Sequence, residues 1–140
     1  MRKYLFTLII VALYSCSSNK TVDRPLYEIL TVNNDGGANI KFYEILTEAK
    51  EIRMLLGDET LRKKIKESDI NNSSFVILNT GPTKESYNRM KIEKVVETAN
   101  QIEIYVKDTQ KNIETNMADE NTQYPYTILK VNSKKPIVIK

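Results

Sequence analysis

Alternating apolar and polar positions predict that most of this chain forms β-strands. Residues 26–33 and 39–46 are rich in β-branched and aromatic side chains, which favour strands. The run Asn-Asn-Asp-Gly-Gly at residues 33–37 lies at the junction between them. Because asparagine and glycine accept the positive φ angles of tight reversals, we expect these two segments to pair as a hairpin.

The middle of the chain gives the clearest amphipathic hairpin. Residues 87–97 alternate between apolar and charged side chains, residues 98–100 form a turn, and residues 102–106 alternate again. This period of two is typical of strands that bury one face. The apolar face is expected to consist of Met90, Ile92, Val96, Ile102, Ile104 and Val106.

Three further segments complete the predicted β-structure. Residues 74–78 form a continuous apolar run, which is typical of a central strand covered on both faces. Residues 124–131 and 136–140 are apolar and β-rich, with a polar turn between them, so we expect a closing hairpin. Pro136 lacks an amide hydrogen, which favours a position at the start of an edge strand.

Helical spacing is found in residues 47–66. Apolar side chains recur every three or four positions from residue 47, and Gly57 can end this helix. Asp58 can cap a second short helix over residues 59–66. The basic side chains of this helix are expected to face water, with contact to anionic head groups as the alternative. We therefore expect a mainly antiparallel α+β fold, a small sheet or sandwich of hairpins, with one short helical pair between the second and third strands.

The beginning of the chain has the layout of an export signal. Arg2 and Lys3 precede an apolar run at residues 4–13, and the small Ser15 precedes Cys16. The run is too short to span a bilayer, which needs about 20 apolar residues. Leu-Tyr-Ser-Cys at residues 13–16 resembles the lipobox of bacterial lipoproteins, in which cleavage occurs before the cysteine and the sulfur carries a diacylglycerol.

The alternative for Cys16 is a free thiol at the end of an ordinary signal peptide. A single exposed thiol in an exported protein is open to oxidation, and a thioether removes this liability. Several acyl chains also give a stable anchor, whereas one chain binds only marginally. We expect a signal peptide at residues 1–15, a lipidated cysteine and tether at 16–25, and a single domain at 26–140.

Composition excludes several classes of function. Histidine is absent and Cys16 is the only cysteine, which excludes His-based triads, Cys–His dyads and the usual zinc and copper ligand sets. The formal net charge of +3 includes Arg2 and Lys3, so the chain without its signal is close to neutral. We expect no cofactor and no nucleic-acid partner.

The polar segment at residues 108–123 contains the remaining candidate chemistry. Its carboxylates lack the alternating spacing and turn glycine of a calcium loop, so no metal site is expected. Two of them could act as the acid and base of a small envelope enzyme, but a long polar loop has little to raise a pKa or exclude water. We expect a protein that is not an enzyme and keep the enzyme as an alternative. The carboxylates of this segment are Asp108, Glu114, Asp119 and Glu120, and the last three are the candidates for acid or base.

The second half of the chain resembles a known family. Leu-Asn-Thr-Gly at residues 78–81 is followed by a loop ending in Tyr87, an alternating strand pair, a polar loop and Tyr-Pro-Tyr at residues 124–126. This succession resembles the C-terminal domain of the PrcB-like protease-complex subunit family, and the layout of residues 26–140 is similar to its lipoprotein members. The family commonly has Gly-Gly-Tyr where this chain has Glu-Ser-Tyr, so only Tyr87 carries over at that motif.

The resemblance implies an accessory or inhibitory protein-binding role. The residues that it marks as candidates for binding a partner are Gly81, Tyr87, Thr122, Pro125 and Tyr126. Tyrosine is enriched at interfaces because it combines broad contact area with a polar tip. For the tyrosines at 124 and 126, packing at the margin of the sheet is the preferred interpretation, with partner binding as the alternative.

We therefore expect a non-catalytic, lipid-anchored protein of the bacterial envelope. Its partners would be the membrane, through acyl chains on Cys16, and another envelope protein, with a protease as one candidate. Ser17 in place of an acidic residue favours the outer membrane, and the domain could face either the periplasm or the cell surface. A structural lipoprotein with no dedicated ligand is a further alternative.

Overall fold

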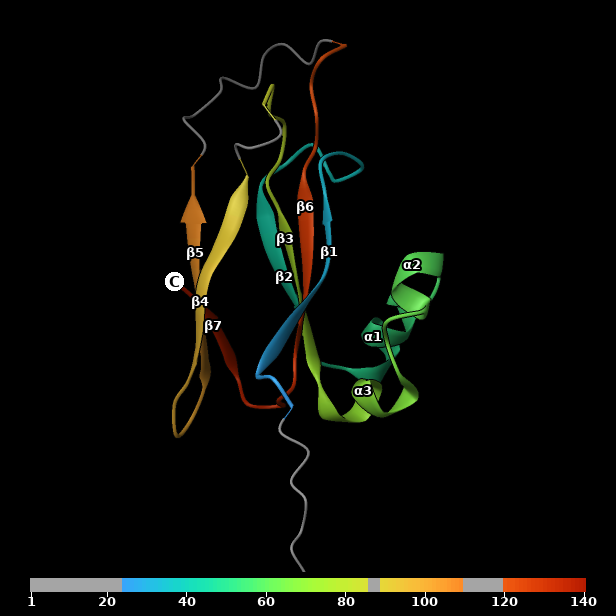
Figure 1. The fold of residues 1–140 in the computed structure, drawn as a ribbon, viewed down its shortest axis with the longest axis vertical. Coiled ribbons are helices and arrows are strands. Elements are labelled where there is room, and N and C mark those ends of the chain that lie inside the picture. Colours follow the sequence, from blue (N-terminus) through green and yellow to red (C-terminus); the bar gives the residue numbers. More distant parts are fainter. Residues whose placement is uncertain (1–23, 86–88, 110–119) are drawn as a thin grey trace, which may run out of the picture.

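The protein folds into three layers, with helices, a four-stranded sheet and a three-stranded sheet packed in that order (Figure 1). The computed structural model describes residues 24–85, 89–109 and 120–140. The expected α+β class, mainly antiparallel with a helical stretch between the second and third strands, is confirmed.

The four-stranded sheet is antiparallel throughout. Its strands lie in the order β1-β6-β3-β2, so β6 and β3 occupy the centre and β1 and β2 the edges. The bounds are β1 Tyr27–Asn33, β2 Phe42–Leu46, β3 Ser74–Asn79 and β6 Tyr126–Val131.

The three-stranded sheet combines both pairing modes. It lies in the order β4-β5-β7, with β4 antiparallel and β7 parallel to β5. The bounds are β4 Met90–Glu97, β5 Ile102–Asp108 and β7 Ile137–Ile139. Pro136 directly precedes β7, which is an edge strand as expected.

Three short helices connect β2 to β3. Helix α1 (Ala49–Leu55) and helix α2 (Glu59–Arg62) lie where the pair was predicted, but α2 ends four residues before the expected residue 66. The Asp58 carboxylate caps α2 by accepting hydrogen bonds from two backbone amides. Helix α3 (Glu67–Asn72) was not predicted. Ile70 is its only buried apolar residue, so α3 has no apolar periodicity that a sequence could reveal.

Two hydrophobic cores lie on opposite faces of the four-stranded sheet. The first core joins this sheet to the helices and consists of Leu30, Leu46, Ile52, Leu61, Ile65, Ile70, Phe75 and Ile128. The second core joins it to the three-stranded sheet and consists of Val76, Leu78, Met90, Ile102, Ile104, Leu129 and Val131. Adjacent residues of β3, Phe75 and Val76, belong to different cores, which confirms the prediction of a central strand covered on both faces.

Two of the three predicted hairpins are wrong. Strands β1 and β2 lie at opposite edges of one sheet, and β6 and β3 separate them. Strands β6 and β7 belong to different sheets, where β7 pairs with β5 instead. Because β3 and β6 are apolar on both faces, burial is greatest when they take the centre of the sheet, and the turn-rich segments then become connections between distant strands.

The third predicted hairpin, β4 with β5, is confirmed, with one error on its apolar face. The register of the pair shifts between Ile92 and Lys94, which marks a β-bulge. The extra residue reverses the alternation beyond it, so Val95 packs against the second core and Val96 is exposed. The prediction that Val96 faces the core is therefore wrong.

Within the described residues, no helix has the length and apolar character needed to cross a membrane.

Candidate binding site

The strands of the central sheet run between two ends of the domain, which carry different groups of residues. At one end, Tyr27 of β1 pairs with Val131, and the chain enters the domain through Arg24 and Pro25. We call this the tether end. At the other end, Asn33 pairs with Tyr126. The two ends lie about 20 Å apart, as expected for a seven-residue strand.

The second end is built from three connecting segments at residues 34–41, 80–85 and 120–125, and we call it the loop end. Asn79 holds the first segment in place from the end of β3. Its side chain is buried, and its Oδ1 accepts a hydrogen bond from the Ala38 amide at 2.9 Å. Its Nδ2 donates to the carbonyl oxygens of Ala38, at 2.9 Å, and of Ile40. The Asn79 side-chain amide therefore provides hydrogen-bond partners for backbone groups of this segment, which is not part of a strand.

Two glycines allow this close packing. A Cβ on Gly37 would lie 2.3 Å from Asn79 Oδ1 and 2.7 Å from the Tyr124 carbonyl oxygen, so no side chain fits. Gly81 has a φ of +80°, and its Cβ would lie 3.1 Å from the Lys41 nitrogen. Gly81 is therefore required by the backbone at this position, whether or not it has a role in binding.

Backbone hydrogen bonds join the second and third segments of the loop end. The Thr80 amide donates to the Pro125 carbonyl oxygen at 2.9 Å. Thr83 and Gln123 exchange two hydrogen bonds, at 2.8 and 2.7 Å. The Tyr124 amide also donates to the Asp35 carboxylate at 3.0 Å, which connects the third segment to the first. The loop end is consequently a single hydrogen-bonded unit.

The structure brings four of the five candidates for partner binding to this end. Gly81 and Pro125 are buried, and Thr122 is half-buried. Tyr126 packs against the first core, and its hydroxyl oxygen accepts a hydrogen bond from Asn33 Nδ2. These four residues therefore contribute mainly to the packing of the loop end. Tyr87 lies outside the described residues.

The exposed apolar side chains near this end were missed by sequence reasoning. Ile40 is 65% exposed and Tyr43 is 56% exposed, and both belong to the segment that leads into or forms β2. The sequence predicted that both residues belong to a β-strand segment at residues 39–46. Their exposure depends on β2 being an edge strand, which the predicted β1–β2 hairpin obscured.

Of the carboxylates in the polar segment, Asp108 and Glu120 lie within the described residues. Asp108 ends β5 and forms an ion pair with Lys41, and Glu120 is exposed. Glu114, Asp119 and the lipidation candidate Cys16 lie outside the described part of the chain. Among the described residues, no group of three metal-binding side chains comes together.

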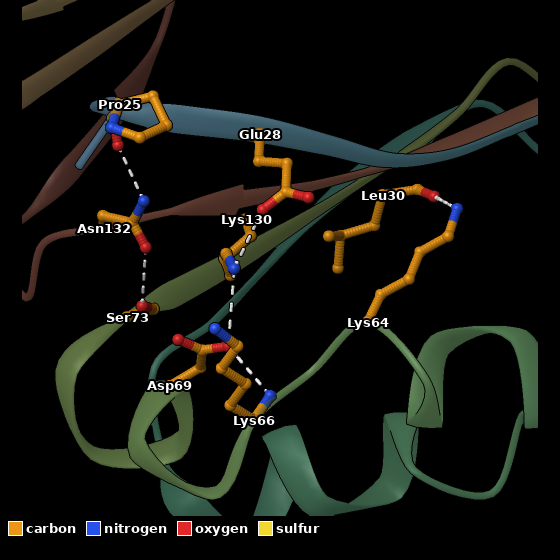
Figure 2. Close-up of polar contacts among 9 residues, drawn as sticks. All are labelled: Pro25, Glu28, Leu30, Lys64, Lys66, Asp69, Ser73, Lys130 and Asn132. Carbon is orange, nitrogen blue, oxygen red and sulfur yellow. Dashed lines mark hydrogen bonds and ion pairs between the residues drawn. The ribbon is translucent and has the colours of Figure 1, made fainter.

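A second polar cluster lies toward the tether end and joins three elements (Figure 2). Lys130 of β6 is only 8% exposed, yet its Nζ lies 2.9 Å from Glu28 Oε2 of β1 and 3.4 Å from Asp69 Oδ2 of α3. The Asp69 carboxylate also accepts a hydrogen bond from the Lys66 amide at 2.9 Å. The ammonium group thus has two carboxylate partners, which compensate its burial.

The same cluster lines a hollow of about 300 Å³ that Arg24, Lys66 and Asn132 also border. The Asn132 side chain donates to the Pro25 carbonyl oxygen at 2.7 Å and accepts a hydrogen bond from the Ser73 hydroxyl at 3.2 Å (Figure 2). These contacts fix the point where the chain enters the domain. Their geometry supports a structural role, since the Lys130 ammonium is engaged by carboxylates on two sides.

Comparisons with protein-family models, with curated proteins and with solved structures find no match.

Proposed function

We propose that this protein is a lipid-anchored, non-catalytic binding module of the bacterial envelope, and that its loop end contacts another envelope protein. The observation that carries this proposal is the separation of the two ends. The chain enters at Arg24, eight residues after Cys16, while the loop end lies at the opposite end of the strands. An anchor at Cys16 would hold the tether end within about 28 Å of the membrane, the length of eight extended residues.

The rigidity of the loop end supports a binding role. Its three segments are joined by backbone hydrogen bonds and by the buried Asn79 side chain, so its exposed surface is organised before any partner arrives. Preorganisation lowers the entropic cost of association. Tethering adds to this effect, because a domain held at a surface meets neighbouring proteins at a high effective concentration. A protease remains one candidate partner, as the resemblance to the PrcB-like family implies.

The anchor is tested by replacing Cys16. We expect Cys16→Ala to abolish labelling by a fatty-acid analogue and to block lipoprotein processing, while Ser17→Ala leaves both unchanged. Retention of the label by Cys16→Ala would refute lipidation at this residue.

The binding role is tested by photo-crosslinking in living cells from two exposed positions. A crosslinker at Ala38 samples the loop end, and one at Lys50 samples α1. We expect a defined envelope protein to be captured from Ala38 and not from Lys50. Equal capture from both positions, or none from Ala38, would leave the structural lipoprotein as the better explanation.

A further inference from the structure

The two sheets present four edge strands, and three of these edges carry features that discourage pairing. Strand β1 has a bulge between Ile29 and Thr31, and β4 has a bulge between Ile92 and Lys94. Strand β7 has only three residues and directly follows Pro136. Bulges, short length and proline are the means by which proteins protect exposed edges from other strands.

The fourth edge, β2, lacks these features. All five of its residues pair with β3 in an unbroken register, without a bulge or a proline. Within the described part of the chain, no strand pairs with its outer edge. Glu44 is the only charged residue of β2. Two exposed apolar side chains lie along this edge, Tyr43 within β2 and Ile40 two residues before it begins.

We propose that β2 accepts an extended segment of a partner protein as an added fifth strand of the central sheet. Main-chain hydrogen bonds would supply affinity in such β-strand addition, and alternate side chains would supply specificity. The edge begins at the loop end, because Phe42 of β2 pairs with Asn79. The inference rests on the proposed binding function and names the surface and the kind of segment that it recognises.

The side chains of β2 define the chemistry of that segment. Tyr43 and Ile45 point to one face of the sheet, where aromatic and β-branched side chains of a partner strand would pack beside them. Glu44 points to the other face and is exposed. A lysine or arginine opposite Glu44 would form a favourable cross-strand pair.

A second copy of this chain fits less well than another protein. If two β2 strands paired antiparallel over their full length, Glu44 would lie directly opposite Glu44 of the other copy. Like charges at directly opposed positions are destabilising. The segment is therefore assigned to a different protein, with a basic residue between two β-branched or aromatic ones.

Two synthetic peptides test this recognition on the full-length protein in nanodiscs. Both alternate valine and threonine, with lysine at the centre of one and glutamate at the centre of the other. We expect the lysine peptide to slow amide exchange in Phe42–Leu46 and to bind about three- to tenfold more tightly than the glutamate peptide. The preference should vanish in Glu44→Gln and reverse in Glu44→Lys. Protection of Tyr27–Asn33 to the same degree, or no protection of β2, would refute the inference.

Photo-crosslinking separates this inference from the proposed function. A crosslinker at Tyr43 samples the β2 edge, and one at Val32, which is 44% exposed on β1, provides a matched control at the opposite edge. We expect Tyr43 alone to capture an extended segment with a basic residue, and Glu44→Lys to reduce the yield severalfold. Capture of a partner from Ala38 but not from Tyr43 would overturn the β2 site and leave the binding function standing. Capture of only a second copy from Tyr43 would overturn the assignment to a different protein.

Discussion

Asn79 shows how one polar side chain organises a whole end of the domain. It is 2% exposed and satisfies three backbone groups of the first segment, which have no strand partner. In the sequence, Asn79 is a polar residue that follows the apolar run at residues 74–78 and precedes Thr-Gly-Pro. Its role depends on contacts some 40 positions away in the chain, which no local pattern reveals.

We expect Asn79→Ala to lower the free energy of unfolding by about 1 to 3 kcal/mol, because it removes a buried side-chain amide and its three hydrogen bonds to the backbone of Ala38 and Ile40. Asn39→Ala, at an exposed position in the same segment, should change it by less than about 0.5 kcal/mol. Denaturant unfolding followed by circular dichroism measures both. Equal effects of the two substitutions would show that Asn79 does not organise this end.

Glu103 on β5 makes the stability of the protein depend on pH. Hydrogen bonds from Lys140, Tyr105 and Gln101 lower the pKa of its carboxyl from 4.5 to about 2. The folded state thus binds the proton less tightly than the unfolded state. The stabilisation by ionised Glu103 is therefore fully present above about pH 4.5 and is lost as the pH falls toward 2.

Glu103→Gln removes this dependence, so we expect the stability difference between wild type and variant to be constant from pH 7 to 5. The difference should then shrink steadily between pH 4.5 and 2. Denaturant unfolding of both proteins across this range measures it. A difference that stays constant down to pH 2 would contradict the lowered pKa.

At the scale of elements, the alternation of side chains predicted which segments are strands more reliably than which strands are neighbours. The β4–β5 hairpin was predictable because its turn is short and its two apolar faces match. The pairing of β7 with β5 was not predictable from the sequence, because it depends on which strands occupy the centre of each sheet. Residue patterns report the buried face of a strand, and they carry little information about the strand beside it.

The Lys130 cluster explains how α3 is attached despite its small apolar surface. The helix contributes Ile70 to the first core and Asp69 to the ion pair with Lys130. A lysine within the apolar run of β6 was visible in the sequence. Its carboxylate partners lie on β1 and on the unpredicted α3, so the cluster could not be assembled before the fold was known.

We expect Asp69→Ala to reduce the free energy of unfolding by about 3 kcal/mol, because it removes one carboxylate from a buried ammonium. Glu67→Ala on the same helix should cost less than about 1 kcal/mol, since its ion pair with Arg53 is exposed and 3.7 Å long. Combining Asp69→Leu with Lys130→Met should cost less than the sum of the single changes. Strict additivity in this double-mutant cycle would show that the two groups are not coupled.

At the scale of the whole molecule, the position of the tether end relative to the loop end makes the proposed orientation measurable. If Cys16 is lipidated, an engineered cysteine is the only free thiol, so it can be labelled alone. Suitable positions are Asn72 of α3, which borders a hollow beside Arg24 and Pro25, and Asn39 in the loop end. Labelling of two thiols per chain would show instead that Cys16 is free.

With a fluorophore at each position and a head-group quencher in the vesicle, we expect Asn72→Cys to be quenched more strongly than Asn39→Cys. The two positions lie at ends separated by about 20 Å along the strands, so a quencher confined to the membrane surface should distinguish them. Because the anchor attaches at the tether end, Asn72 should lie on average nearer the membrane than Asn39, even though a tether of up to about 28 Å lets the domain turn. Equal quenching would mean that the domain lies on its side or tumbles freely, and stronger quenching at Asn39 would place the loop end against the membrane and contradict its role as the outward binding surface.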